Sequence, residues 1–170
     1  MRIYFDVNGT IVGDEGDLRP HTREVFQQIK ARGDHVYLWS ILGPRWDVVE
    51  EHQLGDLVDD CFIKPMPLAV FWPGHKAGGT PKDKPDLCVD DAPAYVESFG
   101  GVLVTSYIGP SPEDRELLRA LDLIVQGTYQ QPRPWRALLR ATFAPVLPLL
   151  APFRFLAGLF FRSRRSSEAP

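Results

Sequence analysis

The chain has 170 residues, of which 44% are hydrophobic and 24% charged, and its net charge is −3 at pH 7. These proportions are typical of a globular protein and exclude a disordered polyelectrolyte. The charge is unevenly divided, because residues 1–127 contain 12 Lys and Arg against 21 Asp and Glu, whereas residues 128–170 contain seven Arg and one Glu. We therefore divide the chain into an acidic domain, 1–127, and a basic, Pro-rich apolar tail, 128–170. The acidic domain argues against nucleic acid as a partner, since a phosphate backbone requires a basic surface.

The cysteine content and the N-terminal sequence indicate in which cellular compartment the protein is expected. Cys61 and Cys88 are the two cysteines, too few for a disulfide framework. Met1 leads directly into an apolar strand pattern, without the charged and then apolar leader of a secretory signal. We expect a cytoplasmic protein.

Apolar runs and helical patterns alternate along the acidic domain. The predicted strands are Ile3–Val7, His35–Ser40, Cys61–Ile63, Leu87–Val89 and Val102–Thr105. The predicted helices are Pro20–Arg32, Arg45–Leu54, Ala92–Phe99 and Pro112–Leu123, with a long loop over 65–83. Because the strands are apolar throughout, both faces of their sheet must be covered. The sequence predicts a three-layer, Rossmann-like α/β fold with a central parallel sheet of five strands.

Polar residues stand where three of these strands end. Asp6 and Asn8 follow the first strand, and Ser40 closes the second. Asp90 and Asp91 follow the fourth strand. The carboxyl ends of parallel strands share one edge of the sheet, where ligands bind. Carboxylates gathered there repel one another unless a cation lies between them, and oxygen ligands favour Mg²⁺, so we expect a magnesium site that also holds phosphate.

The order and context of these residues resemble the haloacid dehalogenase-like (HAD) superfamily of hydrolases over about residues 2–108. Its first motif, Asp-x-Asp-Gly-Thr after an apolar strand, corresponds to Asp6-Val7-Asn8-Gly9-Thr10. Its second motif, a Ser or Thr closing the next strand, corresponds to Ser40, and its fourth, an acid pair after an apolar strand, to Asp90-Asp91.

The resemblance implies an HAD-like fold and a Mg²⁺-dependent phosphohydrolase that acts through an aspartyl-phosphate on Asp6. The implied catalytic residues are Asp6, Asn8, Ser40, Lys82 and Lys84. The implied metal ligands are Asp6, Asn8 through its backbone carbonyl, Asp90 and Asp91. The implied phosphate-binding residues are Gly9, Ser40, Ile41 and Lys84, and Thr10 braces the loop.

The lysine of the family's third motif has three candidates. Lys82 and Lys84 lie in the loop that enters the fourth strand, whereas Lys64 directly follows the third strand. We favour Lys82 and Lys84 over Lys64.

Asn8 departs from the family pattern, in which an aspartate at this position protonates the leaving oxygen and then activates water. An amide cannot exchange a proton at neutral pH. Loss of one general acid or base costs about 10²–10⁴-fold in rate. The sequence therefore predicts a slow phosphohydrolase. The alternative is a catalytically weakened relative that binds metal or a phosphorylated partner, and a third class is a scaffold organised by the tail.

Each motif also has a simpler interpretation. Asn8-Gly9 is a frequent hairpin turn, and Asp90-Asp91 before a helix is a frequent cap. The occurrence of both motifs, with Ser40 between them, favours the phosphoryl site. Response-regulator receiver domains use similar residues, but their acid pair follows the first strand and here it follows the fourth.

The loops around the predicted site and the C-terminal tail indicate which substrates and partners to expect. The intervals 12–19 and 65–83 are too short for the cap domain that usually covers an HAD-like site, and an open site favours a large or protein-borne phosphorylated substrate. In the tail, 143–161 has Arg154 as its one charge and contains three prolines. These features favour peripheral membrane contact through 143–165 over a spanning helix, with packing on the domain or on a partner as the alternative.

Overall fold

The continuous apolar runs of the sequence form one sheet, and the amphipathic segments between them form helices. The computed structural model describes residues 1–65 and 85–133. Its strands are β1 (Arg2–Asp6), β2 (His35–Ser40), β3 (Asp60–Ile63), β4 (Leu87–Asp90) and β5 (Gly101–Leu103). Its helices are α1 (Thr22–Ala31), α2 (Trp46–Glu51), α3 (Pro93–Phe99) and α4 (Glu116–Gln126).

The sheet has the strand order β3-β2-β1-β4-β5, and every neighbouring pair is parallel. This confirms the predicted α/β fold with a five-stranded parallel sheet. The register places Asp6 beside Trp39 of β2 and Phe5 beside Val89 of β4. The carboxyl ends of β1, β2 and β4 therefore meet at one edge of the sheet.

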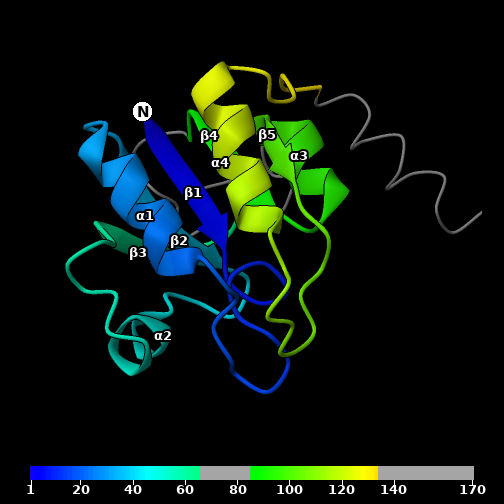
Figure 1. Cartoon of the computed structure of the whole chain (residues 1–170). Helices are drawn as coiled ribbons and strands as arrows, with labels where there is room; N and C mark the ends of the chain where they lie inside the picture. Colours follow the sequence, from blue (N-terminus) through cyan, green and yellow to red (C-terminus); the bar gives the residue numbers. More distant parts are fainter. Residues whose placement is uncertain (66–84, 134–170) are drawn as a thin grey trace, which may run out of the picture. The chain divides into compact units, whose positions relative to one another are not determined.

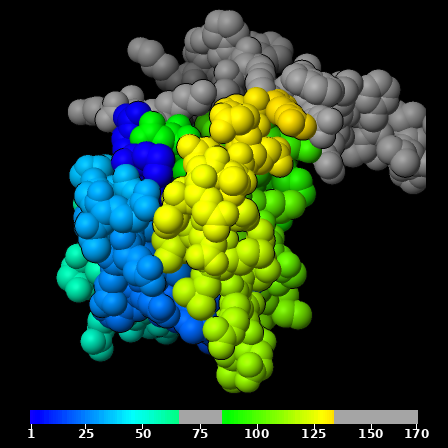
Figure 2. Space-filling model, turned by 45° about the horizontal axis from the view of Figure 1, so that its top comes forward, coloured from blue at the N-terminus to red at the C-terminus, as the bar shows by residue number. Residues whose placement is uncertain are grey.

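Helices cover both faces of the sheet, in agreement with the absence of polar alternation in its strands. On one face Ile3 and Phe5 of β1 pack in a core with Phe26 of α1 and Leu121 of α4. Figure 1 shows α1 and α4 side by side over this face, and Figure 2 shows their surfaces in contact. On the other face an aromatic cluster joins the strands to α3; its buried members are Tyr4, Trp39, Cys88, Tyr95, Val96 and Phe99.

Three helix boundaries differ from the prediction by three residues or more, because of local backbone chemistry. The second helix, predicted to reach Leu54, ends at Glu51, since Gln53 adopts a φ of 52° that a helix cannot contain. The last helix begins at Glu116 because Asp114 Oδ1 accepts the hydrogen bond of the Glu116 backbone N–H at 3.0 Å. It ends at Gln126, followed by Gly127 in the left-handed conformation.

The fifth strand, Gly101–Leu103, ends two residues before the predicted end at Thr105. Gly101 has a φ of 131°, and a Cβ atom there would lie 1.8 Å from the Cys88 carbonyl oxygen, so only glycine fits. Thr105 leaves the strand because its N–H donates to Glu116 Oε2 at 3.2 Å. Gln130 pairs with Gly101 through two backbone hydrogen bonds and so covers the outer edge of β5.

The chain divides into two compact units, Met1–Ala137 and Leu138–Pro170. The second unit lies outside the described residues, and so do the predicted helical tail and the predicted membrane contact of 143–165. Across residues 1–65 and 85–133, no helix is long and apolar enough to cross a membrane.

Candidate functional site

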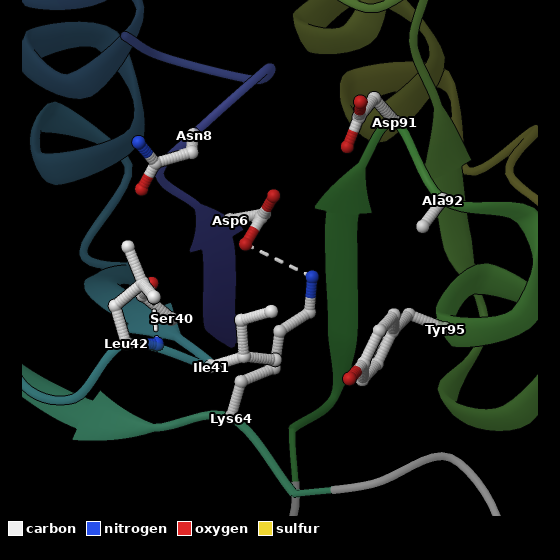
Figure 3. Close-up of a pocket in the computed structure, with 9 residues that line it drawn as sticks. All are labelled: Asp6, Asn8, Ser40, Ile41, Leu42, Lys64, Asp91, Ala92 and Tyr95. Atoms are coloured by element: carbon white, nitrogen blue, oxygen red, sulfur yellow. Dashed lines mark hydrogen bonds and ion pairs between the residues drawn. The ribbon is translucent and has the colours of Figure 1, made fainter. Parts of the chain in front are cut away.

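Polar side chains at or just after the ends of four strands meet at the carboxyl edge of the sheet, and Figure 3 shows those of Asp6, Ser40 and Lys64 among them. Asp6 is the last residue of β1, Ser40 of β2 and Asp90 of β4. Lys64 is the first residue after β3, and its N–H donates to the Ser40 carbonyl at 2.9 Å, which continues the pairing of β2 with β3. Parallel strand ends thus bring together residues that are up to 84 positions apart in the chain.

Lys64 forms the centre of this cluster. Its Nζ lies 2.9 Å from Asp6 Oδ1 and 2.8 Å from Asp90 Oδ2. All three residues are buried, with exposed fractions of 6% for Lys64, 7% for Asp6 and 0% for Asp90. The ammonium also lies 3.7 Å from the centre of the Tyr95 ring, a cation–π contact that helps compensate for its lost hydration.

The ionisation of the cluster follows from its burial. Burial raises the pKa of Asp90 to about 7; the Lys64 ammonium opposes this shift and the Asp6 carboxylate adds to it. Burial also raises the pKa of Asp6 against the same opposing ammonium. Burial by itself lowers the pKa of Lys64, but the charges of Asp90 and Asp6 outweigh it, so the net shift is upward and Lys64 is charged. One ammonium therefore does not fully balance the two carboxylates.

A third carboxylate completes a group that fits a metal ion. Asp6, Asp90 and Asp91 each offer a ligand oxygen, and these oxygens all lie within 4.8 Å of one another. Oxygen-only donors of this kind suit a hard divalent cation such as Mg²⁺, whose charge would oppose the burial and the smaller carboxylate repulsion that raise the pKa of Asp6 and of Asp90. The three aspartates predicted as metal ligands are thus close enough together to hold one.

The loop after β1 is shaped to admit Asp91. Gly9 has a φ of 79°, and a Cβ atom there would lie 2.6 Å from Asp91 Oδ2, so a side chain at this position would displace the carboxylate. Thr10 is fully buried, and its Oγ1 accepts the hydrogen bond of the Asp91 N–H at 3.2 Å. This contact ties the loop after β1 to the loop after β4, a more specific bracing role than the sequence predicts.

Asn8 has a partner that the sequence analysis missed. Its Oδ1 accepts a hydrogen bond of 2.6 Å from Arg45 Nη1, and the Arg45 guanidinium also pairs with Asp47 at 2.8 Å. Figure 3 shows the Asn8 amide on the side of that residue away from the Asp6 carboxylate. The amide is therefore engaged outside the carboxylate cluster. Arg45 gave no sequence signal beyond its place ahead of a helix, since the contact spans 37 positions.

Ser40 and Ile41, the predicted phosphate-binding residues of the second strand and its loop, line the same pocket as Asp6 and Asp91. The Ser40 side chain is buried and its Oγ accepts the Leu42 N–H at 3.2 Å, which leaves its own hydroxyl proton to donate. Ile41 is 66% exposed. A pocket of about 360 Å³ opens over the cluster; its lining residues are Asp6, Asn8, Ser40, Ile41, Leu42, Lys64, Asp91, Ala92 and Tyr95.

The structure describes one of the three candidate lysines of the site, and the preference for Lys82 and Lys84 stays a prediction. Lys82 and Lys84 lie outside the described residues, whereas Lys64, the less favoured candidate, contacts two of the predicted carboxylates. Its position directly after a strand is the same signal that identified Asp6, Ser40 and Asp90. Tyr95 was missed altogether, although it lies on α3 close behind Asp91.

Comparison of the chain with protein-family models, with curated proteins and with solved structures gives no match. The chemical interpretation therefore depends on the geometry of the site itself. That geometry provides a buried carboxylate beside an ammonium, a group of oxygens suited to a divalent cation and a pocket open to a ligand.

Proposed function

We propose that this chain is a Mg²⁺-dependent phosphohydrolase of the HAD kind, with Asp6 as its nucleophile. The observation that carries the proposal is the convergence of Asp6, Asp90 and Asp91 within 4.8 Å, beside the buried ammonium of Lys64. In this proposal the three aspartates and the backbone carbonyl of Asn8 hold the ion. When bound, Mg²⁺ acts as a Lewis acid toward the phosphoryl oxygens and neutralises charge.

The chain's own residues would perform the transfer in two steps. A carboxylate oxygen of Asp6 forms a bond to phosphorus while the bond to the ester oxygen breaks, and the leaving group departs with the electron pair. Water then attacks the aspartyl-phosphate, which restores the Asp6 carboxylate and releases phosphate. The Lys64 ammonium and the Ser40 hydroxyl stabilise the charge on the phosphoryl oxygens. The place of Lys64 beside Asp6 supports this role for it in preference to Lys82 and Lys84.

Asn8 supplies no proton to the leaving group, so the proposed enzyme turns over slowly. A general acid contributes about 10²–10⁴-fold, and an amide cannot replace it. Aryl phosphates, whose leaving groups need little protonation, are therefore the substrates on which wild-type activity is easiest to observe.

The proposal is tested by hydrolysis of p-nitrophenyl phosphate in the presence of Mg²⁺. We expect activity that EDTA removes and that Asp6→Asn reduces by about 10³-fold or more, because the amide is not a nucleophile toward phosphorus. Asp14→Asn, a change of an exposed acid in the loop after β1, serves as the control and retains wild-type activity. Intact mass verifies that Asn8 has not become aspartate by deamidation. Activity that survives Asp6→Asn would refute the assignment of the nucleophile.

The second candidate is a protein that binds metal or a phosphorylated partner without turnover, and the Asn8–Arg45 contact favours it. Activity that is absent in the wild type and appears in Asn8→Asp would establish this candidate.

The carboxylate introduced by Asn8→Asp would face the Arg45 guanidinium, which would keep the pKa of this carboxylate low and make it a poor proton donor. We therefore expect Asn8→Asp/Arg45→Met to exceed Asn8→Asp by about tenfold in rate, a change of about one pKa unit. Arg45→Met alone gives no gain.

The short connection between β1 and α1 supports a phosphorylated substrate of large size. Residues 7–21, which connect β1 to α1, hold no helix or further strand of the sheet, so no cap domain is inserted there. A phosphate group carried on a large molecule would enter through the pocket over Asp6. Screening free sugar phosphates against phosphopeptides tests this part, and a preference for the sugar phosphates would contradict it.

A further inference from the structure

The pocket over Asp6 combines a charged floor with apolar walls. Asp6, Lys64 and Asp91 provide the charges, which match a metal ion and a phosphate group. The walls are apolar, unlike the floor, and Ile41 and Leu42 from the loop between β2 and α2 form one of them. Ala92 and Tyr95 stand on the other side, with Lys64 between the two walls in Figure 3.

The exposure of two wall residues calls for an explanation. Ile41 is 66% exposed and Leu42 is 72% exposed, although both are large aliphatic residues. Single exposed aliphatic residues are common on protein surfaces and need no explanation. Here, however, two consecutive ones line the same pocket as the carboxylate cluster, and exposed apolar surface concentrated at a cleft marks a binding site.

Among residues 1–65 and 85–133, Leu42 belongs to neither buried core cluster. Its backbone N–H holds Ser40 Oγ, which any residue except proline could do, while its side chain faces the pocket. A polar phosphate ester, such as one of glycerol, would leave these walls in contact with water. An apolar group next to the phosphate would bury them and gain the corresponding transfer free energy.

We infer that the pocket selects phosphomonoesters whose ester oxygen carries an apolar aliphatic or aromatic group, with Leu42 and Ile41 as specificity-determining residues. The inference rests on the proposed function, since it names the substrate class of that same site. A volume of about 360 Å³ lies at the lower end of the range of small-ligand pockets, roughly 300–1,000 Å³. It admits an apolar group of the size of one or two fused rings together with the phosphate.

The test compares kcat/KM for 1-naphthyl phosphate and for glycerol phosphate with Mg²⁺. We expect the wild type to prefer the naphthyl ester. Leu42→Asn, which keeps the branching of the side chain but removes its apolar character, should lower the ratio of the two values about tenfold. Ile108→Asn is the matched control, since Ile108 is 71% exposed but does not line the pocket. Its ratio stays at the wild-type value. An unchanged ratio in Leu42→Asn would overturn the inference.

A binding measurement separates this inference from the proposed function. Titration calorimetry with 1-naphthylphosphonate, which is not hydrolysed, is run with Mg²⁺ on the same three proteins. The inference predicts about tenfold weaker binding to Leu42→Asn and unchanged binding to Ile108→Asn, even if no ester is hydrolysed. Equal affinity of all three proteins would refute the inference. If Leu42→Asn alone binds the phosphonate more weakly but the wild type hydrolyses no ester, only the proposed enzymatic activity is refuted.

Discussion

Lys64 is a buried ammonium whose charge is needed by two buried carboxylates. Replacement by Met keeps most of the side-chain volume but leaves Asp6 and Asp90 without their counter-ion. We expect Lys64→Met to lower the free energy of unfolding at pH 7 by about 3 kcal/mol, because breaking a buried pair leaves uncompensated charge. Urea denaturation in EDTA measures the effect.

The control for Lys64→Met is Lys30→Met, which removes a more exposed lysine from its ion pair with Asp59. Asp59 keeps a hydrogen bond from the Val36 N–H at 2.8 Å, and exposed pairs contribute little. The expected loss is below about 1 kcal/mol. Equal losses for the two variants would contradict the assigned role of Lys64.

Among the site residues, the sequence predicted those at strand ends. It did not predict those that only contacts between distant parts of the chain bring to the site. Asp6, Ser40, Asp90 and Asp91 follow apolar runs, and the parallel sheet alone suffices to gather them. Arg45 and Tyr95 reach the site through side-chain directions that no spacing encodes. The preference for Lys82 and Lys84 came from the family pattern, whereas the strand-end rule favours Lys64.

An ion pair between a buried arginine and a partly buried aspartate joins two loops on the site side of the sheet. Arg19, 1% exposed, lies in the connection between β1 and α1 and pairs with Asp114, in the turn before α4, at 2.8 Å. Arg19 Nη1 also donates to the Thr10 carbonyl at 3.1 Å. The pair thus links α4 to the loop that positions Gly9 and Thr10 against Asp91.

We expect Asp114→Asn to lower the free energy of unfolding at pH 7 by about 3 kcal/mol, because it leaves the buried Arg19 guanidinium without its counter-charge. Asp56→Asn is the control: its pair with Arg23 is exposed, with a separation of 3.6 Å, and contributes less than about 0.5 kcal/mol. Chemical denaturation of both variants gives the comparison. A loss for Asp114→Asn no greater than for Asp56→Asn would show that the ion pair does not stabilise these loops.

The same variant gives a pH dependence with a definite sign. Burial tends to raise the pKa of Asp114, but the hydrogen bond and charge of Arg19 outweigh it, and the net pKa lies below the ordinary 3.8. Because the pKa of Asp114 is lower in the folded state, its ion pair contributes full stability at pH values above the pKa of the unfolded state. That stabilisation is lost as the pH falls through the pKa of the folded state. The difference between wild type and Asp114→Asn should therefore be constant from pH 7 to about pH 5. It should shrink below pH 4, and a difference that grows there would contradict the assignment.

For the molecule as a whole, the fold was more predictable than its boundaries. Unbroken apolar runs indicated strands covered on both faces, and helices do cover both faces of the observed sheet. Gln53 and Gly101 show why the ends were not predictable. A positive φ after α2 and a close approach of β5 to Cys88 depend on the packed structure and leave little trace in local composition.

A metal ion bound at the carboxylate cluster should stabilise the whole domain, because it binds the folded state and has no site in the unfolded chain. At a Mg²⁺ concentration about 100 times its Kd, the gain is about 2.7 kcal/mol, which corresponds to a rise in Tm of roughly 5–10 °C. Differential scanning calorimetry with MgCl₂ against EDTA, at ionic strength matched with KCl, measures this rise.

Asp91→Asn is the informative variant for this measurement, because Asp91 is half-buried and has no ion pair among the described residues, so its replacement spares the Lys64 cluster. We expect it to fold and to lose more than half of the rise in Tm. Asp14→Asn, which changes net charge equally but lies outside the cluster, keeps the full rise. A rise that is equal in all three proteins would assign the effect to Mg²⁺ binding elsewhere on the acidic domain, and the absence of any rise would argue that the ammonium of Lys64 is the site's own cation.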